Sequence, residues 1–312
     1  MVENTTWPGY RIWEPGFYVQ DDWRATSKLI LNIGLRYDVF TPLSEVHNQI
    51  SNFDPSTGKI IIAGVNGVSS TAGVKTDYKD FAPRFGFAYT PTNGLVVRGG
   101  FGLSFAPTSL ASGIYLKNPP FVAGVNFNNT GLTLPLAASA YNISQGFPPA
   151  VAVNPANPTV TLNATNENCK STYVEQYNLT VQKEIAKSVV SVGYVAALSR
   201  RLADAYDLNE ALPGLGAVNP RRPFFAQYPA AAAMNYIVTD GLADYHSLQA
   251  SFERRLANGL VVNSNYTWAH SIHSDASAGI GGVGGTPLIT DRRTNRGNAP
   301  EDIRNRWTLA LN

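Results

Sequence analysis

Polar and apolar residues alternate along several stretches of the chain. In "LILNIGLRYDVF", residues 29–40, every second residue from Leu29 is apolar or aromatic. The residues between them are mostly small, polar or charged. A period of two places successive side chains on opposite faces of a β-strand. This stretch is therefore predicted to be a strand with one apolar face and one polar face.

The same alternation recurs along the sequence, whereas helical periodicity is scarce. Besides a segment that ends at Trp23, the predicted strands cover residues 29–40, 81–90, 95–105, 177–185, 189–195, 246–256, 260–268 and 306–312. The pattern indicates an all-β, antiparallel fold with about nine strands.

Short and long connections alternate between these strands. The connections near residues 24–28, 90–94, 186–189 and 257–259 are short, and those over roughly 41–80, 106–172, 197–243 and 271–302 are long. Residues that pair in a hairpin must share a face. We therefore predict that Tyr89 pairs with Leu95, Ile185 with Val190, Leu256 with Leu260 and Trp23 with Leu29. The last register puts Asp21 on the apolar face, which a bulge or a position at a membrane interface would explain.

The apolar face could contact a protein core or lipid, since a β-sandwich also shows alternation. Most of the predicted strands are longer than the five or six residues of an ordinary strand, and a membrane strand needs about nine to eleven. Tight turns that alternate with long loops are typical of outer-membrane barrels, as are aromatic residues near strand ends. Such aromatics are Trp23, Tyr37, Tyr89, Tyr266, Trp268 and Trp307. We predict a transmembrane β-barrel, with a secreted sandwich or adhesin as the alternative.

Composition excludes several other classes of protein. Only 15% of the residues are charged, the formal net charge is +2, and no block of like charge suggests nucleic-acid binding. The single cysteine, Cys169, excludes a disulfide scaffold. No apolar run reaches the ~18 residues of a transmembrane helix, and the first residues do not resemble a signal peptide. Either the protein stays inside the cell or this chain lacks its true N-terminus.

The polar face of the predicted sheet would line a wet lumen. Its candidate residues are Arg36, Asp38, Arg84, Arg98, Gln182, Glu184, Glu253 and Arg255. Arg84 is expected near Arg98 across a hairpin. A network of salt bridges along the wall is one interpretation of this set, and direct contact with a substrate is the other.

The long loops carry aromatic residues among prolines and asparagines, a combination that suits stacking on sugars or gripping peptides. They are Phe121, Phe127, Tyr141, Phe147, Phe224, Phe225 and Tyr228. The alternative is that these aromatics pack against one another and make the loops rigid.

Other candidate chemistry favours a structural interpretation. In "HSIHSD", His270, His273 and Asp275 could bind a metal, but a solvated loop is the simpler interpretation, so we predict no metal and no cofactor. Asp21 and Asp22 could form an acid–base pair, although a turn or interface role is favoured. No nucleophile stands beside a base, and we predict no enzyme activity.

Nine segments, in order, resemble the barrel of Oar-like TonB-dependent receptors, which occur in Acidobacteria and myxobacteria. They are "GFYVQDDWRATSKLILNIGLRYDVFTP", "FAPRFGFAYTP", "VVRGGFGLSF", "NPPF", "YVEQYNLTVQKEI", "GYVAALSRRL", "DYHSLQASFERR", "NYTWAHSI" and "EDIRNRW". The resemblance covers essentially the whole chain. It implies a 22-stranded outer-membrane barrel with long extracellular loops, preceded by a carboxypeptidase-regulatory-like domain and a plug.

The chain departs from that family pattern. Residues 1–312 correspond to part of the barrel, and the signal peptide, regulatory domain, plug and C-terminal strands are not recognised. We therefore expect a fragment that is inactive by itself. The resemblance implies uptake of a large, oligosaccharide-like nutrient, with outer-membrane lipid and the TonB complex, reached through the plug, as partners. The alternative function is surface adhesion or protein export.

Overall fold

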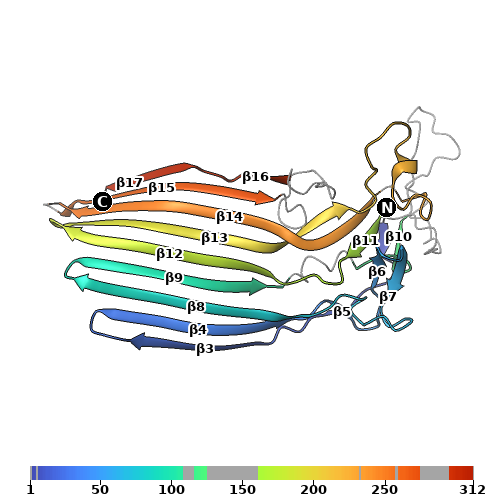
Figure 1. The fold of residues 1–312 in the computed structure, drawn as a ribbon, viewed down its shortest axis with the longest axis horizontal. Helices are drawn as coiled ribbons and strands as arrows, with labels where there is room; N and C mark the ends of the chain where they lie inside the picture. The colour runs from blue at the N-terminus through green and yellow to red at the C-terminus, as the bar shows by residue number, and fades with distance from the viewer. Residues whose placement is uncertain are drawn as a thin grey trace, which may run out of the picture.

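The computed structural model describes residues 2–4, 6–107, 116–124, 161–231, 233–256, 259–274 and 295–311. Most of these residues form one sheet in the order β16-β15-β14-β13-β12-β9-β8-β4-β3, with β17 beside β15 and β11 beside β14 (Figure 1). All pairs in this sheet are antiparallel except β11–β14, which is parallel. None of the described helices is long and apolar enough to cross a membrane.

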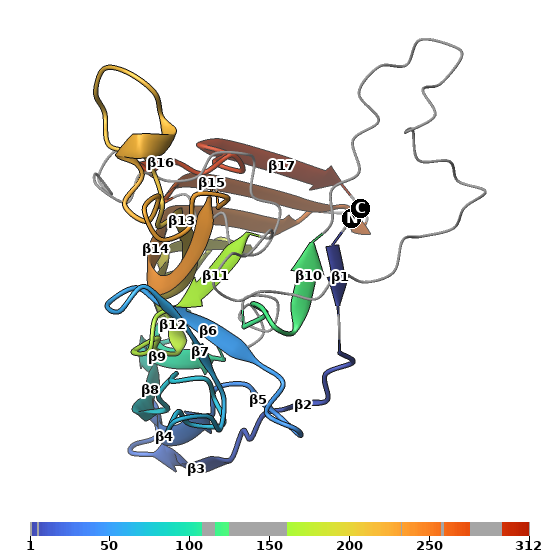
Figure 2. The same cartoon turned by 90° about the vertical axis from the view of Figure 1, so that its right-hand side faces the viewer.

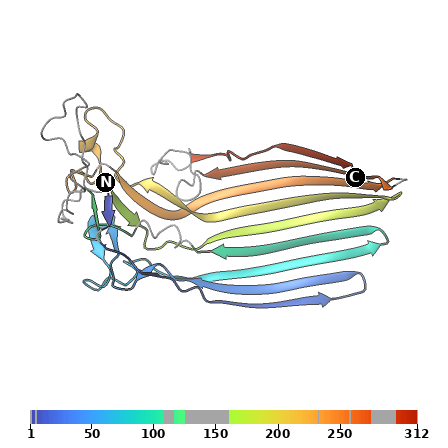
Figure 3. The ribbon, with the colours of Figure 1, turned by 180° about the vertical axis from the view of Figure 1, so that it is seen from behind.

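Each strand that the alternation predicts is present in this sheet. The long strands are β3 (Gly16–Arg24), β4 (Leu29–Phe40), β8 (Asp77–Thr92), β9 (Leu95–Ala106), β12 (Thr172–Ile185), β13 (Ser188–Asp207), β14 (Met234–Arg255), β15 (Val261–Ser274) and β17 (Asn305–Leu311). Figure 3 shows from behind that they run side by side, with the tight turns at one end, the turn end, and the long connections at the other, the loop end.

Three of the four predicted registers are wrong by two residues. Tyr89 pairs with Val97 instead of Leu95, and Ile185 pairs with Ser188 instead of Val190. In the first hairpin Leu31, not Leu29, lies opposite Trp23. An error of two residues preserves the face of every side chain, so the predicted faces are unaffected. The fourth register is confirmed, because Ala250 lies opposite Tyr266 as the pairing of Leu256 with Leu260 requires.

Tight turns explain two of these errors. The β12–β13 turn consists of Ala186 and Lys187, whose φ angles of 46° and 67° are left-handed, as in the two-residue turns that suit twisted hairpins. The β8–β9 turn consists of Asn93 and Gly94, where Gly94 has a φ of 73°, and a bulge between Tyr89 and Thr92 then places Tyr89 opposite Val97. The sequence suggested wider turns because neither alternation nor composition marks the last paired residue.

One face of the sheet is apolar and uncovered. Leu179, Tyr194 and Leu248 lie side by side on β12, β13 and β14, and each is at least 39% exposed. The same face carries exposed Ile33, Phe85, Phe101, Val181, Val192, Phe252, Tyr266, Trp268, Trp307 and Leu309. Figure 2 shows the strands nearly end-on as a single-layered open arc, without a second sheet packed on it. A soluble sandwich would bury such a face, because soluble monomers rarely expose a large apolar patch.

The loop end holds the short elements, of which β1 and β10 lie at the open side of the arc in Figure 2, whereas β11 and β16 pair with long strands of the sheet. The short elements are β1 (Val2–Asn4), β2 (Tyr10–Arg11), β5 (Ser44–Glu45), β6 (Ser51–Asp54), β7 (Lys59–Ile62), β10 (Val122–Gly124), β11 (Leu162–Thr165), β16 (Arg296–Asn298) and the 3₁₀ turn η2 (Asn219–Arg221). The expected loop over 197–243 is shorter than predicted, because β13 continues to Asp207 and β14 starts at Met234.

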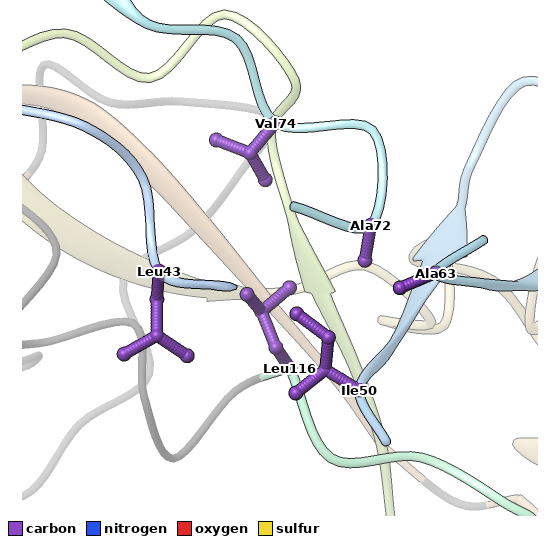
Figure 4. Packing of buried hydrophobic residues seen from close by; sticks show 6 residues of the cluster. All are labelled: Leu43, Ile50, Ala63, Ala72, Val74 and Leu116. Atoms are coloured by element: carbon purple, nitrogen blue, oxygen red, sulfur yellow. The ribbon is translucent and has the colours of Figure 1, made fainter. Parts of the chain in front are cut away.

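Two small apolar clusters hold the loop end together. In Figure 4, side chains from separate stretches of the chain face one another; they are Leu43, Ile50, Ala63, Ala72, Val74 and Leu116. The second cluster contains Phe53, Leu162, Ala164, Tyr228, Ala231 and Met234. Both clusters combine residues from several of the long connections, so these connections form one packed unit.

Buried asparagines tie the backbones of this unit together. Asn118 is fully buried, and its Nδ2 donates to the carbonyls of Ser51 and Asn163 at 3.0 and 2.8 Å. Its Oδ1 accepts from the Asn163 amide at 2.7 Å. Asn52 does the same for Thr165, accepting from its amide and donating to its carbonyl, both at 2.8 Å. Each amide side chain therefore acts as a piece of strand that pairs with β11.

A buried carboxylate fixes the N-terminal approach to β3. Glu45 accepts hydrogen bonds from the backbone amides of Gly9 at 2.9 Å and of His47 and Gln49 at 2.7 Å. Burial raises the pKa of Glu45, but these three amides outweigh that effect, and the net pKa lies below its ordinary value. Glu45 therefore stabilises the loop end in its ionised form.

We predict that Asn118→Leu destabilises the loop end by about 2–4 kcal/mol, because two carbonyls and one amide lose a buried partner. Hydrogen exchange at the Asn163 amide should speed up accordingly. The control is Asn168→Leu, an exposed asparagine, which should leave that exchange unchanged. Equal effects of the two substitutions would contradict the role given to Asn118.

We predict that protection of the Gly9 and Gln49 amides depends on the charge of Glu45. A lowered pKa means that the stabilisation is complete above pH 4.5, the ordinary value, and is lost as the pH falls through the lowered pKa. Protection factors should fall in acid in the native protein, and Glu45→Gln should show low protection without that pH dependence. The Thr165 amide, held by a side chain that does not titrate, is the internal control.

Candidate functional site

All eight predicted lumen residues lie on the polar face of the sheet. Cross-strand pairs give the face of each residue, because partners in a ladder point to the same side. Glu184 and Glu253 both lie opposite Val189, and Gln182 lies opposite Ser191. Through these rows and the alternation along each strand, the polar face carries Arg36, Asp38, Arg84, Arg98, Gln182, Glu184, Glu253 and Arg255.

Arg84 and Arg98 share this face but are not neighbours. Arg84 lies opposite Gly102, whereas Arg98 lies opposite Ala88. Four residues of β9 therefore separate their rows, which is about 13 Å along the strand. The expected proximity of the two arginines is wrong, and the two-residue error in the β8–β9 register is the reason.

The best-ordered charge group of the polar face lies near the loop end. The Nε of Arg36 donates to both carboxylate oxygens of Asp38, at 2.8 and 2.9 Å, and Asp38 is only 4% exposed. Gly16 lies opposite Asp38, and a Cβ there would lie 2.6 Å from Asp38 Oδ1. This glycine therefore lets β3 pass close to the ion pair.

Further carboxylates surround this ion pair, and the sequence did not single them out. Asp80 is fully buried directly opposite Asp38. Asp77 lies three positions before Asp80 on β8, and its carboxylate forms an ion pair with Arg201 at 3.6 Å. Asp80 lies four positions from Arg84 on β8, so the alternation pattern alone places it on the same face as Arg84. Recognising its contact with Asp38 required the β4–β8 register.

Two of the predicted loop aromatics are packing residues. The ring of Phe53 makes edge contacts with Phe224 and Tyr228, at centroid distances of 5.2 and 5.9 Å. Tyr228 is buried, and its hydroxyl donates to the Gly58 carbonyl at 2.9 Å. For Phe224 and Tyr228 the packing alternative therefore describes the contacts. Phe121 and Phe225 are half-buried at the loop end. Phe127, Tyr141 and Phe147 lie outside the described residues.

His270 and His273 lie on opposite faces of β15, because they are three positions apart on a strand. The Nδ1 of His270 lies 3.2 Å from the Asp302 carboxylate, and its Nε2 lies 3.3 Å from the Arg304 guanidinium. The Nδ1 of His273 contacts the backbone carbonyl of Ser274. The two imidazoles therefore do not meet, and Asp275 lies outside the described residues. Within the described part of the chain, no group of three or more histidines, cysteines or carboxylates could hold a metal.

Asp21 and Asp22 also point to opposite faces, so they do not form a carboxylate pair. Asp21 lies opposite Ile33 on the apolar face, as predicted, and Asp22 accepts a hydrogen bond from Asn32 on the polar face. The β3–β4 pairing is continuous from Gly16 to Arg24. A bulge therefore does not explain the position of Asp21.

Three solved structures that this chain resembles are much larger than the chain itself. One is the siderophore receptor PiuA from Acinetobacter baumannii, with 11% identity and a TM-score of 0.47 over 96% of this chain and 31% of the receptor. Another is the pyoverdine outer membrane receptor FpvA from Pseudomonas aeruginosa, with 10% identity and a TM-score of 0.45 over 98% and 29%. The FrpB iron transporter from Neisseria meningitidis has 10% identity and a TM-score of 0.44 over 87% and 28%.

The chain thus spans less than a third of the length of these three structures. No curated protein sequence matches it. A family model described as "Outer membrane beta barrel domain" matches residues 2–312, nearly the whole chain. With its exposed apolar face, its long antiparallel strands and this match, the chain belongs to the outer membrane β-barrel domain family and is located in the outer membrane.

Proposed function

We propose that this chain forms part of the wall of a TonB-dependent transporter that imports a large, oligosaccharide-like nutrient. The observation that carries the proposal is the two-faced sheet. Its apolar face is exposed, and its polar face presents charged residues from β4 to β14. A barrel built from such strands encloses a wet lumen. The order of the nine Oar-like segments supports the same assignment.

The edges of the sheet support a larger barrel. Among the described strands, β3 pairs only with β4, and β17 pairs only with β15. Unpaired backbone groups in lipid cost several kcal/mol each, so both edges require further strands. We propose that other strands of the same protein close the barrel to about 22 strands, a size at which the lumen of outer-membrane transporters holds a plug. A plug domain would then connect the barrel to TonB, and the loop end would face outside.

Roles on the polar face follow from this arrangement. Arg36, Asp38, Arg84 and Arg98 would contact the plug or a passing substrate. Gln182, Glu184, Glu253 and Arg255 would line the lumen near the turn end, which would face the periplasm. At the loop end, Phe121 and Phe225 remain candidates for ligand contact. No step in this function requires bond making or breaking by the protein.

The second candidate function is surface adhesion or protein export. Apolar side chains in the connection between β13 and β14 favour adhesion, because Leu212, Leu215 and Val218 are at least half exposed at the loop end. Exposed apolar residues there could attach to another surface.

Deletion of the complete gene separates the two candidate functions. Energised transport predicts that uptake of a labelled neutral oligosaccharide is lost and that collapse of the proton-motive force has the same effect on the parent strain. Restoring the gene should restore uptake. Loss of cell attachment with unchanged uptake would favour adhesion instead.

We predict that Leu179→Arg prevents assembly into the outer membrane, whereas Asn178→Arg is tolerated. Leu179 is 48% exposed on the apolar face, and an arginine near the bilayer midplane costs about 2–4 kcal/mol. Asn178 is its neighbour on the polar face, opposite Gly100, so an arginine there projects into the lumen. Heat-modifiable mobility of the complete protein in the membrane fraction measures assembly. Equal amounts of both folded variants would contradict the assignment of the two faces.

A further inference from the structure

A polar cavity of about 350 Å³ lies in the packed loop end. Its walls come from the β6–β7 hairpin, the turn that follows β11, and β14. Its lining residues include Asp54, Ser56, Asn166, Glu167, Asn168 and Tyr236. Glu167 and Asn168 are exposed at its rim, so the cavity opens to solvent. None of these residues belongs to the groups that sequence patterns single out.

Hydrogen bonds hold the polar groups of the cavity in place. Asp54 accepts from the amide and hydroxyl of Ser56 at 2.9 and 2.7 Å. On the opposite wall, the Asn166 side chain donates to the Tyr236 hydroxyl at 2.6 Å and accepts from the Asn168 amide at 2.8 Å. The buried Asn52 amide joins the two walls. A site that is ordered before binding loses little entropy when a ligand enters.

The cavity wall is negatively charged. The hydrogen bond from Lys75 lowers the pKa of Glu167, and a hydrogen bond from Asn168 acts in the same direction. Burial raises the pKa of Asp54, but hydrogen bonds from Ser56 and Thr57 outweigh it, and the net pKa is lowered. Both carboxylates are therefore ionised near neutral pH. Lys75 pairs with Glu167 at 3.0 Å from outside the cavity lining.

These features select one class of ligand. Carboxylates and amide oxygens accept hydrogen bonds from hydroxyl groups, and charged acceptors make the stronger ones. Tyr236 lines the cavity beside them, and an aromatic side chain suits the C–H face of a sugar ring. Anionic ligands such as phosphates, uronates or anionic metal chelates would meet the carboxylates of Asp54 and Glu167, of which Glu167 is paired with Lys75. We infer that this cavity is a subsite for about one or two rings of a neutral oligosaccharide, an inference that rests on the proposed function.

The size of the cavity agrees with a subsite rather than a complete binding site. About 350 Å³ is near the lower end of the range of about 300–1,000 Å³ for small-molecule sites. An oligosaccharide would place an end or a branch in the cavity while the rest of its chain extends past Glu167 and Asn168. The cavity would therefore favour neutral over anionic oligosaccharides when the ligand first contacts the loop end.

The experiment uses the complete protein purified from outer membranes, with an array of neutral hexasaccharides and an array of uronic-acid hexasaccharides as probes. The native protein should bind at least one neutral hexasaccharide and none of the uronic acids. Glu167→Gln should weaken neutral binding by about tenfold, the effect of about one charge-assisted hydrogen bond. It should also raise uronic-acid binding, a change that general loss of structure does not produce.

Two further variants complete the design. Glu14→Gln makes the same chemical change at an exposed glutamate outside the cavity and should leave both arrays unchanged. Lys75→Gln removes the cation that pairs with Glu167 and should leave binding of the neutral array unchanged. The double variant, with both Glu167→Gln and Lys75→Gln, should bind uronic acids less well than Glu167→Gln alone. Heat-modifiable mobility confirms that each variant is folded.

The outcomes separate failure of the subsite from failure of the proposed function. If the native protein binds a neutral hexasaccharide and Glu167→Gln changes neither array, the subsite is wrong while oligosaccharide uptake stands. If only uronic acids bind, the charge selectivity is wrong. If no hexasaccharide binds and uptake is absent as well, the proposed function and the subsite both fail.

Discussion

The requirement that backbone amides and carbonyls stay paired in lipid governs the rest of this structure. Water is absent from the bilayer core, so each long strand must bond to a neighbour along its whole length. The continuous ladders from β3 to β15 meet that requirement. They also explain why the apolar face can stay uncovered, since lipid takes the place of a core. The open edges at β3 and β17 are where the requirement is still unmet among the described strands.

Beyond the long strands the physical problem changes, because the loop end must be ordered with only short strand pairs. Small apolar clusters and buried amides both contribute to its stability. Asn118 and Asn52 reproduce the donor and acceptor pattern of a strand, so β11 is held by side chains as well as by β14. Glu45 extends the principle to the N-terminal approach, with a carboxylate accepting three amides. This order gives the polar cavity defined walls.

Charge is distributed differently at the two ends of the polar face. Near the loop end, Arg36 and Asp38 form a close ion pair beside the buried Asp80. Near the turn end, Glu184 and Glu253 share a row with Val189 and have no such partner in that row. Groups that are already paired in a fixed geometry suit a wall, whereas carboxylates that face open space suit contact with a mobile partner. The polar face therefore carries a close ion pair near the loop end and exposed carboxylates near the turn end.

The sequence by itself determined the strands, their two faces and the alternation of turns and loops, because a period of two is a local property of the chain. It also placed all the lumen candidates on one face, since parity survives a register error of two residues. Only the tertiary structure decided which residues are neighbours across strands: Arg84 lies away from Arg98, and Asp80 lies opposite Asp38. Packing buries Tyr228 in an apolar cluster and places the partly buried Phe224 against it. It also assembles the polar cavity from segments more than 100 residues apart, as the Asn52–Thr165 bond shows. Contacts at such separations depend on register and packing, which no local pattern encodes.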